Sequence, residues 1–449
     1  MVTSIGKESR LYHHPDIHIC PGYCMMKIMR SVRVYRYRWV MLISLINLVL
    51  AGSLQWLNFA PVGRIVNAYY RDQIHLRFFN PIDLLSLTYL IVYVLFSIPS
   101  GWIIRKLGMR VTYWIASGLI IFGAMTKTLY LSSFKTVLFG QILLGLAQTF
   151  TLTSITETTS RWFPIRERGV AVGIIQASQY LSLALVMILS PLFVVRSQKG
   201  IEQLMRLWAI ISILLAAVSA ALVRERPPSP SSTFEREEEM KFSQALTSAF
   251  SRRSLRILIM EFATSWAVLM TVFIKIDEIS EFLGFANSNG ILAITMLIFG
   301  MVSAVVIPAL SDRFRKRKVF YTFCALTAVP GSFLLLSGNI TVALIGAAIL
   351  GSGLLASIPI GSQYATELGH GINEKVIQAL LQFFSQLATV VILFVTTIIK
   401  ERYQLVLPAI LATILLGTLI ATFFIKESEV IVTEDERLKA LIELENVQH

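Results

Sequence analysis

Residues 84–110 read LLSLTYLIVYVLFSIPSGWIIRKLGMR, an apolar run that ends in a basic cluster. A run of about 20 apolar residues is long enough for a helix to cross a bilayer. Lys and Arg placed just after such a run favour the cytoplasmic side. The stretch therefore predicts a membrane-spanning helix whose C-terminal end faces the cytoplasm.

Runs of this kind recur along the chain. We expect twelve spans, at 39–68, 82–104, 111–131, 135–160, 168–194, 204–223, 255–283, 289–310, 319–338, 340–366, 376–399 and 403–425. Pro, Ser and an acidic run separate the sixth span from the seventh and keep that segment in water. We predict an all-α membrane protein with twelve transmembrane helices in two six-helix bundles. Its expected parts are a leader (1–38), a first bundle (39–223), a linker (224–253), a second bundle (254–425) and a tail (426–449).

Composition supports the same class. Hydrophobic residues make up 55% of the chain and charged residues 15%, whereas soluble domains have about 45–50% apolar and about 25% charged residues. This argues against a soluble enzyme, a disordered chain and a nucleic-acid-binding protein.

The net charge of +13 comes from 40 basic and 27 acidic residues. Its clusters at 27–38, 105–110, 161–168 and 313–318 fall on one side, which predicts both termini in the cytoplasm. We expect a plasma (or cytoplasmic) membrane location.

The chain lacks the common motifs of catalysis. We find no His-Glu-x-x-His, no Gly-x-Ser-x-Gly and no Walker loop, so we expect neither an enzyme nor an ATP-driven pump. Three cysteines give no disulfide framework. Cys20 and Cys24 lie close to His13, His14 and His18, which allows a metal site, but an exposed leader is the simpler interpretation. We therefore expect no resident metal or cofactor.

Two basic turns stand at equivalent places in the two halves. One is Gly101–Arg110 after the second span, and the other is Pro308–Lys318 after the eighth. Such repetition predicts a transporter built from two related bundles. The turns resemble a loop motif of the major facilitator superfamily, whose acidic position is Arg105 in the first half and Asp312 in the second. A further stretch, WFPIRERGVAVG at 162–173, resembles a second pattern of that superfamily.

Charged residues near these turns are candidates for gating. An acid at a helix end can hold a neighbouring helix through an arginine or a helix N-terminus. The candidates are Glu157, Arg168, Asp312, Arg313 and Glu367. The alternative is that the basic turns only set the topology. The charged group at 275–281 is either an outer helix end in water or an outer-gate ion pair.

Polar side chains inside the spans are the candidates for substrate binding, because such groups are costly in a bilayer and usually face a cavity or a partner. They are Gln55, Trp56, Asn58, Gln179, Trp266, Gln382 and Gln386. A neutral cavity of amides and aromatic rings suits a small polar solute, and Trp56 offers a cation–π face. The alternatives are interhelical hydrogen bonds for the glutamines and simple packing for Trp56.

Three patches carry a closer resemblance. They are Arg38 to Leu42 with Gln55 and Trp56, Ser178 with Gln179, and Pro359–Leu368 followed by Gln386. The chain resembles the feline leukaemia virus subgroup C receptor-related transporters. That resemblance implies transport of choline and ethanolamine, with haem export also proposed, and a cavity containing Trp56, Gln179 and Gln386. A tyrosine of the family's seventh span falls near Val268 here, which leaves the aromatic cage incomplete.

We therefore expect a monomeric carrier in the lipid bilayer that moves a small polar or cationic organic molecule, choline-like or ethanolamine-like, by rocker-switch alternating access. The alternatives are an exporter of haem or another metabolite, and a transporter-like receptor without transport. We see no acid at mid-membrane, which favours facilitated or potential-driven movement. If transport is coupled to protons, Glu157 or Glu261 is the candidate carrier.

Overall fold

The computed structural model describes residues 35–74, 79–194, 199–228, 242–285, 290–372, 374–398 and 403–428, and their regular structure is helical. The predicted leader around Cys20 and Cys24 lies outside these residues. The first half comprises α2 (Arg38–Trp56), η1 (Ala60–Val62), α3 (Gly63–Tyr69), η2 (Arg71–Gln73), α4 (Pro81–Leu107), α5 (Met109–Leu129), α6 (Phe134–Trp162), α7 (Ile165–Val194) and α8 (Lys199–Leu222). The second half comprises α9 (Phe242–Ser251), α10 (Arg253–Phe282), α11 (Ile291–Phe314), α12 (Arg317–Leu335), α13 (Ile340–Leu368), α14 (Glu374–Ile398) and α15 (Tyr403–Thr422).

Among the described residues, 11 helical stretches are long and apolar enough to cross a membrane. α15 stands where we expect the twelfth span, and it contributes the shorter apolar stretch Leu411–Thr422. The predicted all-α membrane fold is thus confirmed. The first span differs from a simple helix, since α2 ends at Trp56 and the chain continues through η1, which contains Pro61, into α3.

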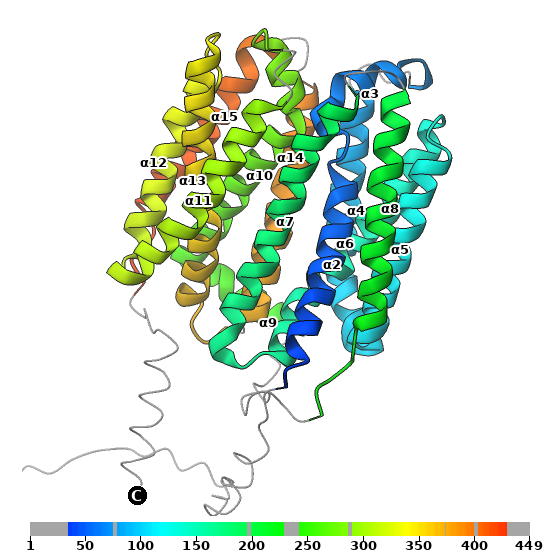
Figure 1. Cartoon of the computed structure of the whole chain (residues 1–449). Helices are drawn as coiled ribbons and strands as arrows, with labels where there is room; N and C mark the ends of the chain where they lie inside the picture. The colour runs from blue at the N-terminus through cyan, green and yellow to red at the C-terminus, as the bar shows by residue number, and fades with distance from the viewer. Residues whose placement is uncertain are drawn as a thin grey trace, which may run out of the picture.

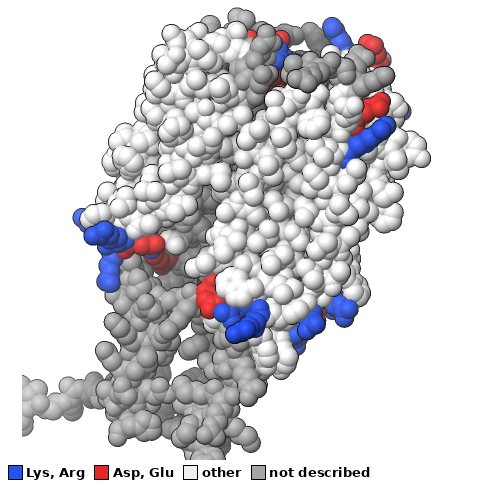
Figure 2. All heavy atoms as spheres, in the orientation of Figure 1, with Lys and Arg blue, Asp and Glu red and all other residues white. Residues whose placement is uncertain are grey.

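The outer surface of the molecule fits a bilayer. Large apolar side chains such as Leu95, Phe122 and Val305 are 63%, 65% and 72% exposed. Figure 2 shows charged side chains gathered at the two ends of the visible face, with an uncharged surface between them. We call the end that carries Arg38, Arg105 and Arg317 the basic end, and the end that carries Arg64 and Asp83 the opposite end.

The helices form two bundles that stand side by side (Figure 1). In the first, α2 packs against α6, α7 and α8, while α5 packs against α6 and α8. In the second, α13 packs against α11 and α12, while α10 packs against α14 and α15. The boundary between the bundles is formed by α4 on α14, by α7 on α11, and by η1 and α3 on α10. This boundary is where a transporter of two bundles would hold its solute.

Small residues allow the closest helix contacts in the second bundle. A Cβ atom on Gly351 of α13 would collide with the backbone of Met296 on α11, and one on Gly346 would collide with the backbone of Leu335 on α12. Close backbone approach through small residues is typical of packed helices in membranes. α13 is therefore held between α11 and α12 with little freedom to shift.

The two halves repeat one local device at the basic end. The Glu225 carboxylate accepts hydrogen bonds from the backbone N–H groups of Met109 and Arg110, at 3.0 and 2.7 Å, at the start of α5. In the second half, the Glu427 carboxylate accepts one from the backbone N–H of Lys318, at 2.9 Å, near the start of α12. Each acid follows the last helix of its half and stabilises the N-terminus of the third, as carboxylates do at the positive end of a helix.

The Glu225 contact gives a pH-dependent prediction. Partial burial alone would raise the pKa of Glu225, but the hydrogen bonds from Arg110, Met109 and Arg161 outweigh it and hold the pKa below its usual value. A group with a lowered folded-state pKa stabilises the protein above its unfolded pKa, about 4.3, and loses that effect as the pH falls. We expect Glu225→Gln to cost about 0.5–1 kcal/mol at pH 7 and progressively less as the pH drops through 4. Thermal melts in detergent at both pH values measure this difference.

The control for Glu225→Gln is Glu202→Gln. Glu202 forms an exposed ion pair with Arg206, with an N···O distance of 3.6 Å and side chains that are 55% and 69% exposed. Such pairs contribute little. Equal effects of the two substitutions at pH 7 would contradict the stabilising role of Glu225.

Candidate functional site

Trp56 lies at the break between α2 and η1, on the boundary between the bundles. Its side chain is buried and its indole stacks on the Tyr89 ring of α4, with ring centroids 5.1 Å apart and an interplanar angle of 11°. Tyr89 thus covers one face of the indole. A cation bound at this indole would have to lie against its other face.

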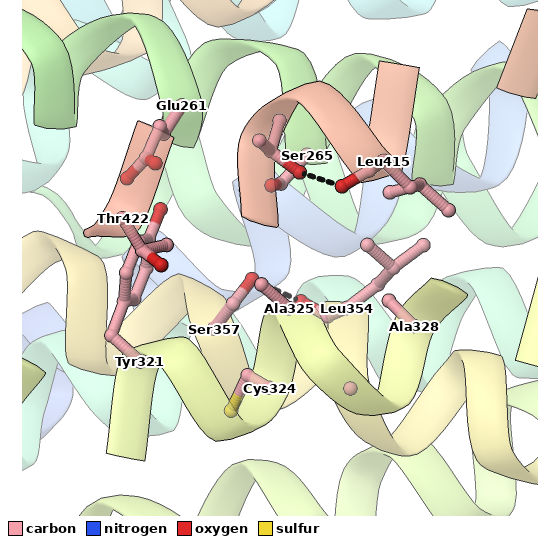
Figure 3. A pocket seen from close by; sticks show the side chains of 12 residues that line it. Glu261, Ser265, Tyr321, Cys324, Ala325, Ala328, Leu354, Ser357, Leu415 and Thr422 are labelled. Carbon is pink, nitrogen blue, oxygen red and sulfur yellow. Dashed lines mark hydrogen bonds between the residues drawn. The ribbon is translucent and has the colours of Figure 1, made fainter. Parts of the chain in front are cut away.

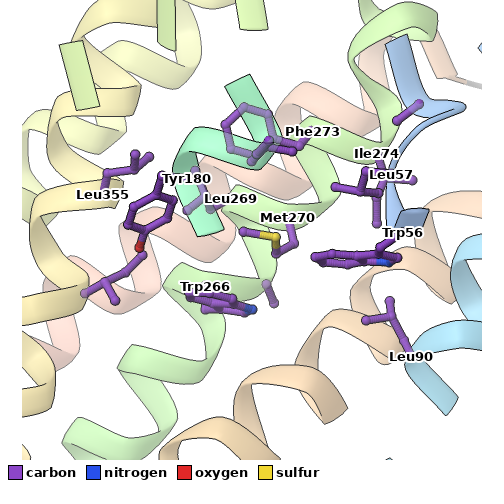
Figure 4. Close-up of a cluster of buried hydrophobic side chains, with 14 of the residues drawn as sticks. Trp56, Leu57, Leu90, Tyr180, Trp266, Leu269, Met270, Phe273, Ile274 and Leu355 are labelled. Carbon is purple, nitrogen blue, oxygen red and sulfur yellow. The ribbon is translucent and has the colours of Figure 1, made fainter. Parts of the chain in front are cut away.

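The second bundle brings Trp266 to the same region. Trp266 lies on α10 and is buried, and Figure 4 shows it in one group of buried side chains with Trp56. Figure 4 draws the side chain of Met270 between the two indole rings, with Tyr180 of α7 nearby. A Met side chain is flexible and polarizable, so it can adapt its shape next to a ligand. Aromatic rings from both bundles therefore meet at this boundary.

Several polar atoms on α2, α4, α6, α7, α10 and α14 are buried and lack a hydrogen-bond partner within the described part of the chain. They are Trp56 Nε1, Tyr89 Oη, Gln148 Oε1, Gln176 Oε1, Tyr180 Oη, Trp266 Nε1 and Gln386 Oε1. A buried polar atom left unpaired costs about 1–3 kcal/mol. A solute with its own donors and acceptors could recover part of this cost, which makes the region a candidate binding site.

Gln55 and Asn58 lie in a different environment from the one we expect. They face the interior of the first bundle, where Lys127 of α5 donates to Gln55 O at 3.0 Å, to Asn58 Oδ1 at 3.3 Å and to Gln141 Oε1 at 2.9 Å. Gln55 in turn donates to Ser212 Oγ at 3.3 Å. Both amides are therefore engaged within the bundle rather than grouped with the two tryptophans.

Lys127 is a residue that the sequence prediction missed. The break after α2 frees backbone carbonyl groups, and two of them find donors: Gln55 O accepts from Lys127, and Trp56 O accepts from Gln141 at 3.4 Å. A cation at a helix C-terminus also interacts favourably with the helix dipole. Lys127 and Gln141 thus fix the end of α2 and with it the position of Trp56. The sequence signal is a lysine inside the third span.

The remaining predicted site residues lie on boundary helices. Gln382 and Gln386 are one turn apart on α14, so they share a face. Gln382 interacts with the hydroxyl of Tyr93 on α4, which shows that this face points across the boundary. Gln179 is half-buried on α7, next to Tyr180.

Ion pairs join the two bundles at the opposite end. The Arg64 backbone N–H donates to Asp277 Oδ2 at 2.8 Å, and its guanidinium Nε donates to Oδ1 at 3.2 Å. Lys275 of α10 pairs with Asp83 of α4, and both side chains are 0% exposed. Lys275 also contacts Glu278 at 3.3 Å. The charged group at 275–281 therefore provides ties between bundles rather than only a solvated helix end.

The ion pairs that the described residues show for the predicted gating residues each lie within one bundle. Glu157 pairs with Arg161 at 2.6 Å, and Arg161 pairs with Glu225 at 2.8 Å. In the second bundle Arg317 pairs with Asp312 and, at 3.0 Å, with Glu367. The structure thus adds Arg161 and Arg317 as central partners.

Arg168 and Arg313 have different surroundings. Arg168 donates to the backbone carbonyl groups of Phe163 and Ser160, at 3.1 and 2.8 Å, and so holds the start of α7 to the end of α6. Arg313 is exposed. The gating roles of all five predicted residues stay predictions.

Two bundles of membrane-crossing helices, with aromatic rings and unpaired polar atoms between them, define a membrane transporter. A family model described as "Major Facilitator Superfamily" matches residues 50–393. The chain belongs to this superfamily. The relatives and the solved structure named below are described as transporters or solute carriers.

Relatives and solved structures agree with this assignment. The chain is 24% identical to an uncharacterised MFS-type transporter of Caenorhabditis elegans, covering 88% of this chain and 70% of that protein. It is 24% identical to the human choline/ethanolamine transporter FLVCR2, covering 79% and 70%. It is 26% identical to solute carrier family 49 member A3 of Xenopus tropicalis, covering 76% and 73%. The crystal structure of a D-xylose-proton symporter shares the fold, with a TM-score of 0.69 and 16% identity over 88% of this chain and 99% of that one.

Proposed function

We propose that this transporter carries a small cationic or polar organic solute, of the choline or ethanolamine kind, by rocker-switch alternating access. In this proposal the protein acts as a monomer in the plasma membrane, with its basic end and both termini in the cytoplasm. The ion pairs at the opposite end then close the outer side of the boundary.

One observation carries the choice of solute: the Trp56 indole stacks on Tyr89 at the bundle boundary, with Trp266 in the same group of buried side chains (Figure 4). Stacked aromatic rings attract a quaternary ammonium group through their negative faces. The unpaired Gln386 Oε1 offers an acceptor for the hydroxyl group of such a solute. Relatives named choline/ethanolamine transporters support the same solute class.

Ligand-dependent melting of the purified protein tests the proposal. Choline and ethanolamine are expected to raise the melting temperature, because a ligand that binds the folded state adds about 2.7 kcal/mol at 100 times its Kd. The control is 3,3-dimethyl-1-butanol, which has the shape of choline without its charge and is expected to leave the melting temperature unchanged.

Uptake of labelled choline into proteoliposomes then separates a transporter from a receptor. Stabilisation without uptake would contradict transport. Stabilisation by haem alone, or by the uncharged alcohol as much as by choline, would contradict the proposed solute class.

A further inference from the structure

A small cavity lies inside the second bundle, among α10, α12, α13 and α15 (Figure 3). Its volume of about 10 Å³ accommodates about one water molecule. Glu261, Ser265, Tyr321, Ser357, Thr418 and Thr422 supply its polar lining. This cavity is distinct from the candidate binding site around Trp56 and Trp266. Glu261 and Trp266 are nevertheless only five residues apart on α10, which corresponds to about 7–8 Å along the helix.

Glu261 is an acid that this cavity leaves without a partner. The residue is 3% exposed, and neither carboxyl oxygen has a hydrogen-bond partner in the described part of the chain. The Tyr321 hydroxyl, which lines the same cavity, is also buried and unpaired. An ionised carboxylate in such a place is strongly destabilising unless a cation compensates it.

Three of the hydroxyl groups that line the cavity have already used their protons. Ser357 donates to Leu354 O at 2.7 Å, Thr418 donates to Leu415 O at 2.7 Å, and Thr422 donates to Leu419 O at 2.8 Å. Each therefore turns lone pairs, not a proton, toward the cavity. A carboxylate finds no donor in these three groups, whereas a protonated carboxyl group can donate its own O–H to them.

Among the described residues, none of the charged groups near Glu261 forms an ion pair with it. α12 presents Tyr321 and Cys324, α13 presents Tyr364, and α15 lines the cavity with threonines. The basic residue Lys318 of α12 is also nearby, and its Nζ donates to Phe423 O at 3.1 Å. At the same end of the bundle, Arg317 is engaged by Asp312 and Glu367.

We propose that Glu261 is a proton-binding site of the transporter, loaded from water and emptied as the bundles alternate. Loading forms one O–H bond on the carboxylate, and unloading returns that proton to water. The proposal rests on the proposed transport function, because one turn and a half of α10 connects Glu261 to Trp266 in the solute site. It differs from the facilitated or potential-driven movement that the sequence favours.

Infrared spectroscopy of the purified protein tests the site without any solute. The carbonyl stretch of a protonated carboxyl group is expected to titrate with pH in the wild type, to be lost in Glu261→Gln, and to persist in Glu281→Gln, a control at an exposed position of the same helix. Persistence of the full band in Glu261→Gln would overturn the proposal. So would a melting temperature that responds to Na⁺ and not to pH, since that identifies an alkali-cation site.

Uptake measured across pH values tests the link to transport. We expect wild-type uptake to vary at least tenfold with pH and uptake by Glu261→Gln to vary less than twofold. Equal pH dependence in the two proteins would overturn coupling through Glu261.

Tyr321→Phe is a second variant in case Glu261→Gln does not fold. It keeps Glu261 but removes the neighbouring hydroxyl group, so the pH midpoint of the infrared titration is expected to shift. A midpoint identical to that of the wild type would count against this cavity. A titrating band together with absent choline uptake would contradict the proposed solute and not the proton site.

Discussion

Replacing Lys275 by alanine is expected to destabilise the folded transporter by about 3–5 kcal/mol, because the substitution leaves the Asp83 carboxylate buried without its partner. Asp83 and Lys275 are both 0% exposed, so water has no access to replace the lost ammonium group. A further ion pair between α10 and the first bundle joins Arg64 to Asp277. The expected readout is a clear fall in the melting temperature of the purified protein.

A double-mutant cycle separates the buried charge from the lost side chain. The double variant Asp83→Asn with Lys275→Met removes both charges and is expected to be more stable than Lys275→Met alone. Arg206→Ala is the control, since its exposed pair with Glu202 should change stability by less than about 0.5 kcal/mol. Additive effects of the Asp83 and Lys275 substitutions would show that the two groups do not depend on each other.

Loss of this pair also has an expected functional result. Asp83 belongs to α4 and Lys275 to α10, so their contact ties the two bundles together at the opposite end. In a rocker-switch carrier, contacts that form in only one conformation stabilise that conformation. Removing such a contact shifts the population toward the conformation that lacks it. The charge-free double variant is therefore expected to fold and yet to expose this end to a thiol-reactive probe at an introduced cysteine more often than the wild type.

The sequence predicts the fold well because the bilayer makes apolar runs long and continuous. Eleven of the predicted spans match membrane-length helices within a few residues, and the basic turns after 101 and 308 mark equivalent positions in the two halves. The break after Trp56 is harder to foresee, since the run 39–68 remains apolar through it. Pro61 is visible in the sequence, but the capping of the freed carbonyl groups by Lys127 and Gln141 depends on helices far along the chain.

For the candidate site, the sequence indicates which residues to consider but not which contacts they make. Trp56 and Gln386 could be found because polar or aromatic groups inside spans are few. Gln55 has the same signal, but its partners Lys127 and Ser212 are only visible once α2, α5 and α8 are packed. The buried pair of Asp83 with Lys275 joins residues 192 positions apart, and periodicity along a single helix carries no information about such a partner.

Trp56→Ala is expected to lower the apparent affinity for choline by about 10–30-fold, because a desolvated cation–π contact contributes about 2 kcal/mol. The substitution removes the Trp56 indole that would face the ligand. It also removes the stacking contact with Tyr89, whose hydroxyl is buried without a partner in the described residues. Trp56→Phe keeps an aromatic face and should fall between the wild type and Trp56→Ala. Uptake into proteoliposomes at choline concentrations below saturation measures the series.

The matched control is Trp102→Ala, since Trp102 lies on α4 and is 57% exposed, with Lys106 over its ring at 4.9 Å. If tryptophan loss acted only through general destabilisation of the protein in the membrane, both alanine variants would show reduced uptake per folded molecule. A role of Trp56 in the binding site predicts reduced uptake for Trp56→Ala and not for Trp102→Ala, with a similar melting temperature in the absence of choline.

Gln386→Ala should show the same pattern as Trp56→Ala with a smaller effect, because it removes one neutral acceptor rather than an aromatic face. Wild-type uptake in both Trp56→Ala and Gln386→Ala would place the solute elsewhere along the bundle boundary.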